Sequence, residues 1–381
     1  MEDVSTIVAK LYEGHPYPPP ILDLSKAISQ GNYQVGDPTL WAPLLWPEGR
    51  PRQKLKILVA GCGTQQAAWF AFTNRDSDVM GVDLSEPSLA HHRYLQEKHA
   101  LQNLRLFRGD LREVGKIGEN FDLIICTGVL HHMADPDEGA RALAGVMVND
   151  GVLVGMVYAA FRRTGVYMMQ DLFRRLEVKP DASGIAFARQ VLASLPPWHF
   201  AHFHINASQD VKSDAGFVDT FLHPQDRAYT VPQVLALIEG NGLHFQGWFE
   251  NALYYPEGSD SIAPELRARL AKIPERDQWA SMELLMQWAH WHFFFARKRP
   301  TPAISFSGDA WKSYVPHYNP GIRRLAQNQF SRLGQPITLS AHEIAPFSAV
   351  DGVKTVGEIG AHTRQMFERL WKQGHIMVSK A

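Results

Sequence analysis

The chain has 381 residues, of which 45% are hydrophobic and 20% are charged, and its formal net charge is -1. This length allows two domains with proper cores, and the balanced charge excludes recruitment of nucleic acid or an anionic membrane by net charge. Its two cysteines, Cys62 and Cys126, exclude a disulfide scaffold and a cysteine zinc site, so the expected location is the reducing cytoplasm.

The sequence predicts neither a secretory signal in its first residues nor a stretch that spans a membrane. Residues 1–14 are amphipathic and acidic, unlike a secretory signal, and the most apolar stretch, 291–298, is too short to cross a bilayer. His199, His202 and His204 lie close together in the sequence, but no carboxylate stands nearby at ligand spacing. We therefore expect no membrane partner and no metal.

Strands and helices alternate between residues 55 and 160. Near-continuous apolar strands separated by helices indicate a parallel sheet that is covered on both faces. Ser85 is expected to cap the helix that follows the second strand. Strands are predicted at 55–61, 77–85, 104–111, 120–129 and 150–159, and helices at 65–72, 86–101 and 135–147.

The alternation loosens and then resumes further along the chain. Residues 161–228 are rich in aromatic, histidine and arginine side chains and are predicted to form an inserted cap. A helix and a strand follow in 230–250, a helical stretch covers 264–289, and the last apolar strand lies in 290–300. The predicted fold is α/β, with a doubly wound, mostly parallel seven-stranded sheet and helices on both faces. The predicted domains are a lead-in and lid at 1–54, the main domain at 55–300 and a small domain at 301–381.

A glycine turn joins the first strand to the first helix. Gly61 and Gly63 allow the backbone to approach a ligand closely, and Asp83, at the end of the second strand, could accept hydrogen bonds from ribose hydroxyls. These features suit NAD and S-adenosylmethionine alike. Gln66 occupies the place of the third glycine of a dinucleotide fingerprint, which weakens the NAD interpretation. A tight turn without any ligand is the simpler alternative.

The ends of the successive strands, "GVDLS", "FRGDLRE" and "FDLIICTGVLHHMADP", resemble those of class I S-adenosylmethionine-dependent methyltransferases. The resemblance implies that the glycine loop wraps the methionine part, that Asp83 holds the ribose and that Asp110 meets the adenine amine. Val59 stands where the family often has an acid, so the contact to the methionine amino group must come from elsewhere. The implied cofactor-binding residues are Tyr17, Gly61, Cys62, Gly63, Asp83, Leu84, Asp110, Leu111, Thr127 and Gly128.

The N-terminal stretch "LYEGHPYPPPIL" is similar to a lead-in found before this domain in some bacterial members of the family. It implies that Tyr12 and Tyr17 close over the cofactor, where aromatic faces suit a sulfonium cation. Alternatively, the proline run simply fastens the N-terminus to the edge of the sheet.

The methyl acceptor is expected to lie between the sheet and the cap. His132 follows the fourth strand, at a position where related methyltransferases often carry a histidine near the methyl group, and is the predicted catalytic residue. Arginine matches a carboxylate bidentately, so the predicted reaction is O-methylation of a small acidic metabolite. Predicted substrate contacts are His131, Tyr158, Arg162, His223, Arg227 and Tyr229.

The C-terminal stretch 337–381 is predicted to form a helix, a turn at Asp351–Gly352, two helices and a short strand. It resembles the small winged-helix-like domains that bind leader peptides. Dimerisation is the simplest role, so a homodimer is expected, and peptide recruitment is the alternative. DNA binding is disfavoured because 362–372 carries only ordinary basic charge. A non-catalytic cofactor-binding scaffold is a further alternative.

Overall fold

The computed structural model describes residues 3–326 and 329–380. Contacts divide the chain into two compact units. The first unit contains residues 1–34, 54–245 and 287–299, and the second contains 35–53, 246–286 and 300–381. The second unit is therefore assembled from three separate stretches of the chain.

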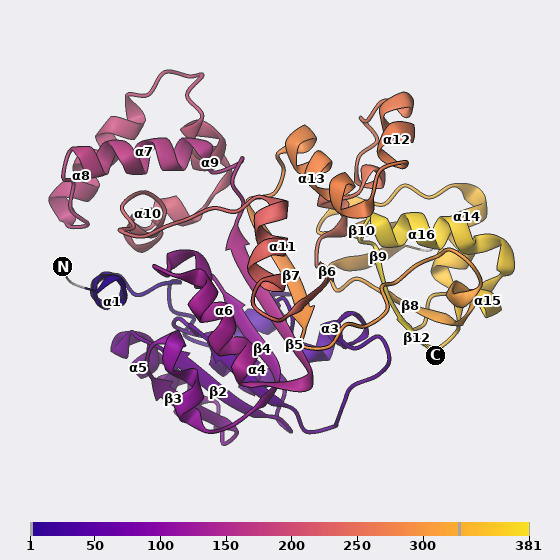
Figure 1. Cartoon of the computed structure of the whole chain (residues 1–381), viewed down its shortest axis with the longest axis horizontal. Coiled ribbons are helices and arrows are strands. Elements are labelled where there is room, and N and C mark those ends of the chain that lie inside the picture. Colours follow the sequence, from indigo (N-terminus) through magenta and orange to yellow (C-terminus); the bar gives the residue numbers. More distant parts are fainter. Residues whose placement is uncertain (1–2, 327–328, 381) are drawn as a thin grey trace. The chain divides into compact units, whose positions relative to one another are not determined.

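A seven-stranded sheet confirms the predicted α/β fold (Figure 1). The strand order is β3-β2-β1-β4-β5-β7-β6, and β7 runs antiparallel to β5 while the pairs from β3 to β5 are parallel. β1 and β4 are buried almost throughout, as expected for strands that are covered on both faces. The strands are β1 (Lys56–Ala60), β2 (Asp78–Asp83), β3 (Leu104–Arg108), β4 (Phe121–Thr127), β5 (Met147–Tyr158), β6 (His244–Trp248) and β7 (Trp291–Arg297).

Helices connect these strands in the predicted order. The hydroxyl of Ser85 accepts a hydrogen bond from the backbone N–H of Ser88, which confirms the predicted N-cap of α5. The connecting elements are α4 (Gln66–Thr73), α5 (Glu86–Lys98), η1 (Leu111–Ile117), η2 (Leu130–His132), α6 (Pro136–Gly145) and α11 (Val231–Glu239).

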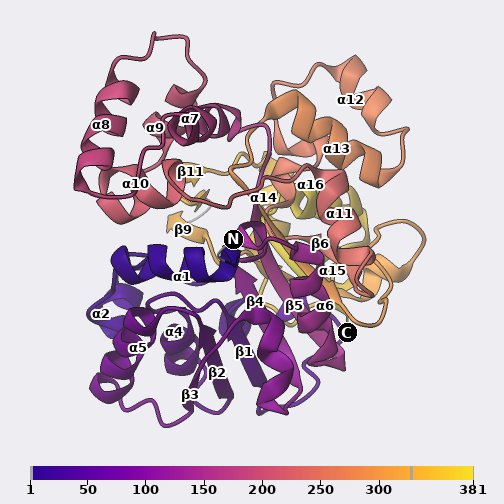
Figure 2. The ribbon, with the colours of Figure 1, turned by 60° about the vertical axis from the view of Figure 1, so that its left-hand side comes forward.

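The insertion after β5 is helical and has its own apolar core. Buried side chains of its helices, including Phe173 and Phe217, pack together with Leu11 of α1 (Val4–Gly14). Figure 2 shows α1 lying between these helices and α4 and α5. The N-terminal segment, which continues into α2 (Leu24–Ser29), is thus built into the first unit. The insertion contains α7 (Thr164–Arg175), α8 (Ala182–Ala193), α9 (Ala201–Ala207), η3 (Asp210–Lys212) and α10 (Asp214–Phe221).

The second unit surrounds a separate aromatic core that includes Trp311, Phe330, Phe347 and Phe367. The three helices and final strand predicted for 337–381 are present as α14, α15, α16 and β12. The short antiparallel strands β8 to β11 were not predicted. The elements are α3 (Pro38–Leu45), η4 (Asn251–Leu253), η5 (Pro256–Gly258), α12 (Pro264–Leu270), α13 (Glu275–Met286), η6 (Ala310–Ser313), β8 (Tyr314–Tyr318), β9 (Ile322–Ala326), β10 (Gln329–Arg332), β11 (Gln335–Pro336), α14 (Ala341–Ser348), α15 (Val356–Ile359), η7 (Ala361–Thr363), α16 (Arg364–Lys372) and β12 (Ile376–Lys380).

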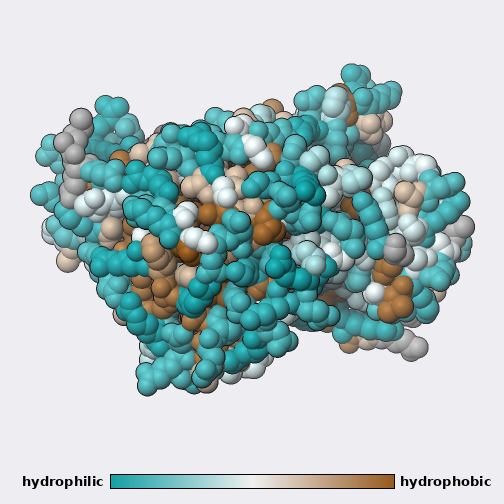
Figure 3. Space-filling model, turned by 60° about the horizontal axis from the view of Figure 1, so that its bottom comes forward, coloured by the Kyte–Doolittle hydropathy of each residue, from teal (hydrophilic) through white to brown (hydrophobic). Residues whose placement is uncertain are grey.

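Hydrophilic side chains cover most of the face seen in Figure 3, and hydrophobic ones show between them in patches. None of the described helices combines the length and the apolar character needed to cross a bilayer.

Candidate active site

A cavity of about 610 Å³ lies in the first unit where the strands β1 to β4 end. Parallel strands place their carboxyl ends at one edge of the sheet, which is the usual ligand site of such folds. The residues predicted to hold the cofactor lie together in the lining of this cavity, and their individual roles stay predictions. They are Tyr17, Gly61, Cys62, Gly63, Asp83, Leu84, Asp110, Leu111, Thr127 and Gly128.

The glycine turn at the end of β1 leaves no room for side chains. Gly61 has a φ of +69°, and a Cβ added there would meet the side chain of Val129 at 2.2 Å. At Gly63, where φ is +53°, an added Cβ would lie 3.0 Å from the carbonyl oxygen of Tyr17. Both positions require glycine for conformation and for space, and they leave the backbone exposed to the cavity.

Asp83 ends β2 with its carboxylate facing this turn. One oxygen accepts a hydrogen bond from the backbone N–H of Gly63 at 2.8 Å, and the other accepts from Ser85 at 2.9 Å. Desolvation of the carboxylate nevertheless raises the pKa of Asp83 to about 6. Additional hydrogen-bond donors, such as ribose hydroxyls, would stabilise the charged form.

Asp110, at the start of η1, has a different environment. Burial is the largest single effect and acts to raise its pKa, but hydrogen bonds from Arg112 and Ser5, together with the charge of Arg112, outweigh burial and lower the pKa. The guanidinium contacts both carboxylate oxygens at 2.9 Å. Asp110 is therefore held ionised and in a fixed orientation at the cavity edge.

Gln66, which takes the place of the third fingerprint glycine, reaches into the cavity. Its amide nitrogen lies 3.0 Å from the hydroxyl of Thr127 and 3.3 Å from the side-chain oxygen of Gln34. All three residues line the cavity. Gln66 therefore links the turn after β1 to Thr127 at the end of β4, and its amide adds polar atoms to the site.

Tyr12 and Tyr17 extend from the N-terminal segment over the same cavity. The hydroxyl of Tyr17 donates to Asp210 at 3.3 Å, and that of Tyr12 donates to Asp219 at 2.7 Å. Both acceptors belong to the helical insertion. The N-terminal segment and the insertion therefore meet at the cavity, and the role of Tyr12 and Tyr17 as a lid stays a prediction.

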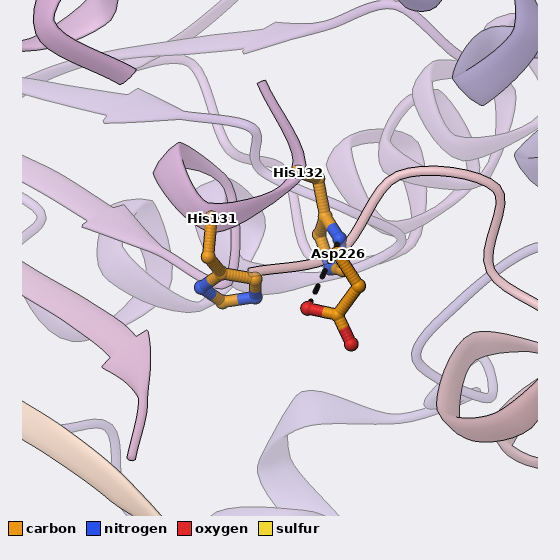
Figure 4. Close-up of side chains that lie close together, drawn as sticks. All are labelled: His131, His132 and Asp226. Atoms are coloured by element: carbon orange, nitrogen blue, oxygen red, sulfur yellow. Dashed lines mark ion pairs between the residues drawn. The ribbon is translucent and has the colours of Figure 1, made fainter. Parts of the chain in front are cut away.

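His132, in the turn η2, also lines the cavity. Its Nδ1 lies 3.0 Å from the backbone carbonyl oxygen of Gln225. Because a carbonyl oxygen can only accept, Nδ1 carries the ring proton and Nε2 carries the lone pair of the neutral ring. Figure 4 shows His131 and His132 projecting from the same turn, with Asp226 4.0 Å from Nδ1 of His132.

Two more imidazoles pack against His132. The ring of His223 stacks on it with centroids 3.9 Å apart, and that of His131 lies edge-on at 4.2 Å. Burial lowers the pKa of both His131 and His223 well below the usual value, so both are neutral. They support the ring of His132 from outside the cavity lining.

The predicted substrate contacts are only partly brought together. Tyr158 lines the cavity, whereas His131, Arg162, His223, Arg227 and Tyr229 do not belong to its lining among the described residues. Arg227 is exposed, and Arg162 lies over the ring of Phe203. The predicted cluster of arginines around the acceptor is therefore not formed in this structure.

The predicted site residues leave out three charged residues of the lining, Arg163, Asp210 and Asp219. The guanidinium of Arg163 lies 3.6 Å from the ring centroid of Tyr158 and pairs with Asp226 at 3.0 Å. Arg163 directly follows Arg162 in the sequence, and no local pattern tells which of the two turns inward. Asp219 lies in the short helix α10, where its sequence resembles an ordinary polar position.

Comparison with known proteins was consistent with the geometry. Residues 58–153 match the model of a family described as a methyltransferase domain. An uncharacterized protein of Synechococcus sp. is 28% identical over 324 residues, which cover 80% of this chain and 75% of that protein. The uncharacterized methyltransferase YcgJ of Bacillus subtilis is 25% identical over 100 residues, 26% of this chain and 39% of that protein.

A solved structure extends the likeness to nearly the whole chain. PKMT2 from Rickettsia typhi, in complex with AdoHcy, covers 96% of this chain and 78% of its own, with a TM-score of 0.69 and 17% identity. At this identity the likeness concerns the fold.

Proposed function

We propose, on the premise that this chain is a class I S-adenosylmethionine-dependent methyltransferase, that it methylates a hydroxyl or amine acceptor with His132 as the general base. The observation that supports this most is the orientation of His132. Its Nδ1 is engaged by the carbonyl of Gln225, which leaves Nε2 as the proton acceptor of a side chain that lines the cavity.

The residues of the cavity suit S-adenosylmethionine. The turn at Gly61 and Gly63 excludes side chains where the backbone must approach a ligand, and Asp83 and Asp110 offer carboxylates at the ends of neighbouring strands. When bound, this cofactor supplies a methyl group activated by a positively charged sulfur. The chain has to hold the acceptor in line with that group and to exclude water, which can contribute about 7–11 kcal/mol.

The charge of the cavity favours an acceptor that carries a proton over the carboxylate acceptor predicted from the sequence. Arg227, the predicted anchor for a carboxylate, is exposed. Arg163 lines the cavity, but its charge is already balanced by Asp226 at 3.0 Å. Among the described residues of the lining, a carboxylate acceptor would find no unpaired arginine or lysine to hold it, whereas a hydroxyl or amine would gain from a base.

Gln225, Asp226 and His223 surround His132 and would assist it as the base. Gln225 fixes the tautomer, and Asp226, 4.0 Å from Nδ1, stabilises the imidazolium that forms when Nε2 takes the acceptor's proton. The stacked ring of His223 holds the orientation. The reaction thereby places a proton on His132 at the moment when the acceptor forms its bond to the methyl carbon.

The test is His132→Gln, with the exposed His244→Gln as the matched control. On the best acceptor from a screen of alcohols, phenols, amines, carboxylic acids and peptides, kcat should fall by about 10²–10⁴-fold in the first variant. The control should keep its activity, and both variants should bind S-adenosylhomocysteine normally. Undiminished turnover in His132→Gln would contradict the role of His132. A wild-type protein that binds the cofactor but methylates nothing in the screen would be a binding protein.

A further inference from the structure

Asp219 is a buried carboxylate in the lining of the cavity. It lies in α10, is only 4% exposed, and has not been assigned a role above. One oxygen accepts a hydrogen bond from the hydroxyl of Tyr12 at 2.7 Å, and the other accepts from Tyr158 at 3.0 Å. Three elements distant in the sequence, α1, β5 and α10, thus converge on this carboxylate.

No cation of the described residues neutralises Asp219. Its neighbour Asp226 pairs with Arg163 at 3.0 Å, but Asp219 makes no ion pair within the described part of the chain. The nearby His223 is neutral because burial lowers its pKa well below the usual value. A buried carboxylate is costly unless it is paired, and two tyrosine hydrogen bonds offset only part of that cost.

A metal ion would be a poorer partner for the Asp219 carboxylate than an organic cation. The ligand atoms of His132, Asp219 and His223 lie within 4.8 Å of one another, which is close enough for a metal site. However, Nδ1 of His223 accepts from the backbone of Gln225 at 3.1 Å, and its Nε2 faces the hydroxyl of Tyr12 at 3.4 Å. The cluster is already connected by hydrogen bonds, and tyrosine rings rather than further carboxylates complete it.

We propose that Asp219 holds a positively charged organic group of a bound ligand, with the rings of Tyr12 and Tyr17, which also line the cavity, beside that charge. Tyrosine faces attract cations, and a carboxylate adds the full opposite charge. The inference rests on the proposed function. Such a charge can come from the sulfonium or the ammonium of the cofactor, or from an ammonium on the acceptor. The cofactor sources are relevant here because Val59 leaves the usual acidic position uncharged.

The experiment compares Asp219→Asn with Asp210→Asn, which removes the same charge from an exposed residue of the same cavity. Calorimetry in the presence of a chelator measures binding of three ligands: S-adenosylmethionine, S-adenosylhomocysteine, which lacks the sulfonium, and sinefungin, which has an amine in its place. Steady-state assays then compare KM for an amine acceptor and for the matching alcohol. Thermal unfolding checks that both variants are folded.

Asp219→Asn should weaken the ligand whose charge it holds by about tenfold or more, and Asp210→Asn should weaken it less because water screens an exposed charge. A loss for S-adenosylmethionine and sinefungin alone identifies the sulfonium, and a loss for all three ligands identifies the cofactor's ammonium. Normal cofactor binding with a raised KM for the amine, but not for the alcohol, identifies the acceptor.

Equal affinities and KM values in Asp219→Asn and the wild type would overturn the proposal, as would activity lost to the chelator and restored by a divalent ion. If Asp219→Asn does not fold, Asp219→Ser also removes the charge, and unchanged binding by that variant would be equally decisive. A wild-type protein that binds no cofactor would instead contradict the proposed function.

Discussion

Asp83 and Asp110 line the same cavity, but their pKa values are shifted in opposite directions. Desolvation raises the pKa of Asp83 to about 6, whereas hydrogen bonds from Arg112 and Ser5 and the charge of Arg112 together offset burial and lower that of Asp110. Because the folded-state pKa of Asp83 lies above its ordinary value, its contribution to stability is present at low pH and is lost as the pH rises through about 6. The free protein therefore keeps one site carboxylate in an unfavourable ionised state at neutral pH.

Cofactor binding near pH 6 should release a proton from Asp83. If ribose hydroxyls donate to the ionised carboxylate, binding lowers its pKa, so affinity for S-adenosylhomocysteine should weaken as the pH falls below about 6. Calorimetry in buffers of different ionisation enthalpy measures the released proton. Asp83→Asn should abolish the release and weaken binding, whereas Asp78→Asn, at the other end of β2, should do neither. Proton release that persists in Asp83→Asn would assign it to another group.

At the scale of elements, the turn after β1 offers a test that separates backbone strain from crowding. Gly61→Ala and Gly118→Ala both place alanine at a positive φ, +69° and +72°. That conformation alone costs about 1–2 kcal/mol. Only at Gly61 would the new Cβ clash, at 2.2 Å from Val129, while Gly118 has open space.

Gly61→Ala should therefore lose more stability than Gly118→Ala and should also lose cofactor affinity. Chemical denaturation and titration with S-adenosylhomocysteine measure the two effects. Equal stability losses with normal binding in both variants would mean that the turn adapts without disturbing the site.

The strands that carry the glycine turn, Asp83, Asp110 and Thr127 could be predicted because buried parallel strands are nearly continuous apolar runs. The acceptor side could not be predicted in this way. Arg163, just before α7, and Asp219, in α10, turn inward because of packing against distant elements, such as Tyr12, which is 207 residues from Asp219.

The short strands β8 to β11 were missed for a related reason. They alternate irregularly between buried and exposed positions, as in β9, where only Ile322 is buried. Two-residue and four-residue strands such as β11 and β10 are too short to show a period of two. The helices α14 and α16 around them are longer and amphipathic, and these were predicted.

At the scale of the whole molecule, the predicted boundary at Pro300 cuts through the second unit. Residues 35–53 and 246–286 belong to that unit together with 300–381. The backbone N–H of Lys380 donates to the carbonyl of Pro47, and the side chain of Asn251 donates to Trp371 at 3.2 Å. The three stretches share one structure, so a truncation at Pro300 would remove part of a folded unit. Whether residues 301–381 have a function of their own stays a prediction.

Truncation after Pro300 should give a protein that aggregates or melts well below the full chain. Removal of β12 takes away the partner of α3, whose buried residues include Trp41 and Leu45. Thermal unfolding and light scattering measure the outcome. A truncated protein that melts like the full chain would show that residues 301–381 are dispensable for folding. Sedimentation of the full chain tests the predicted homodimer independently.

The division of the second unit among three stretches also has a consequence for synthesis on the ribosome. Trp41, Leu45 and Trp46 leave the exit tunnel long before β12 (Ile376–Lys380), which packs against α3. Until β12 emerges, these apolar side chains lack part of their cover, while the strands β1 to β5 can already pair. The nascent chain therefore carries an incomplete, aggregation-prone surface during that interval, and chaperone demand should fall sharply once β12 has emerged.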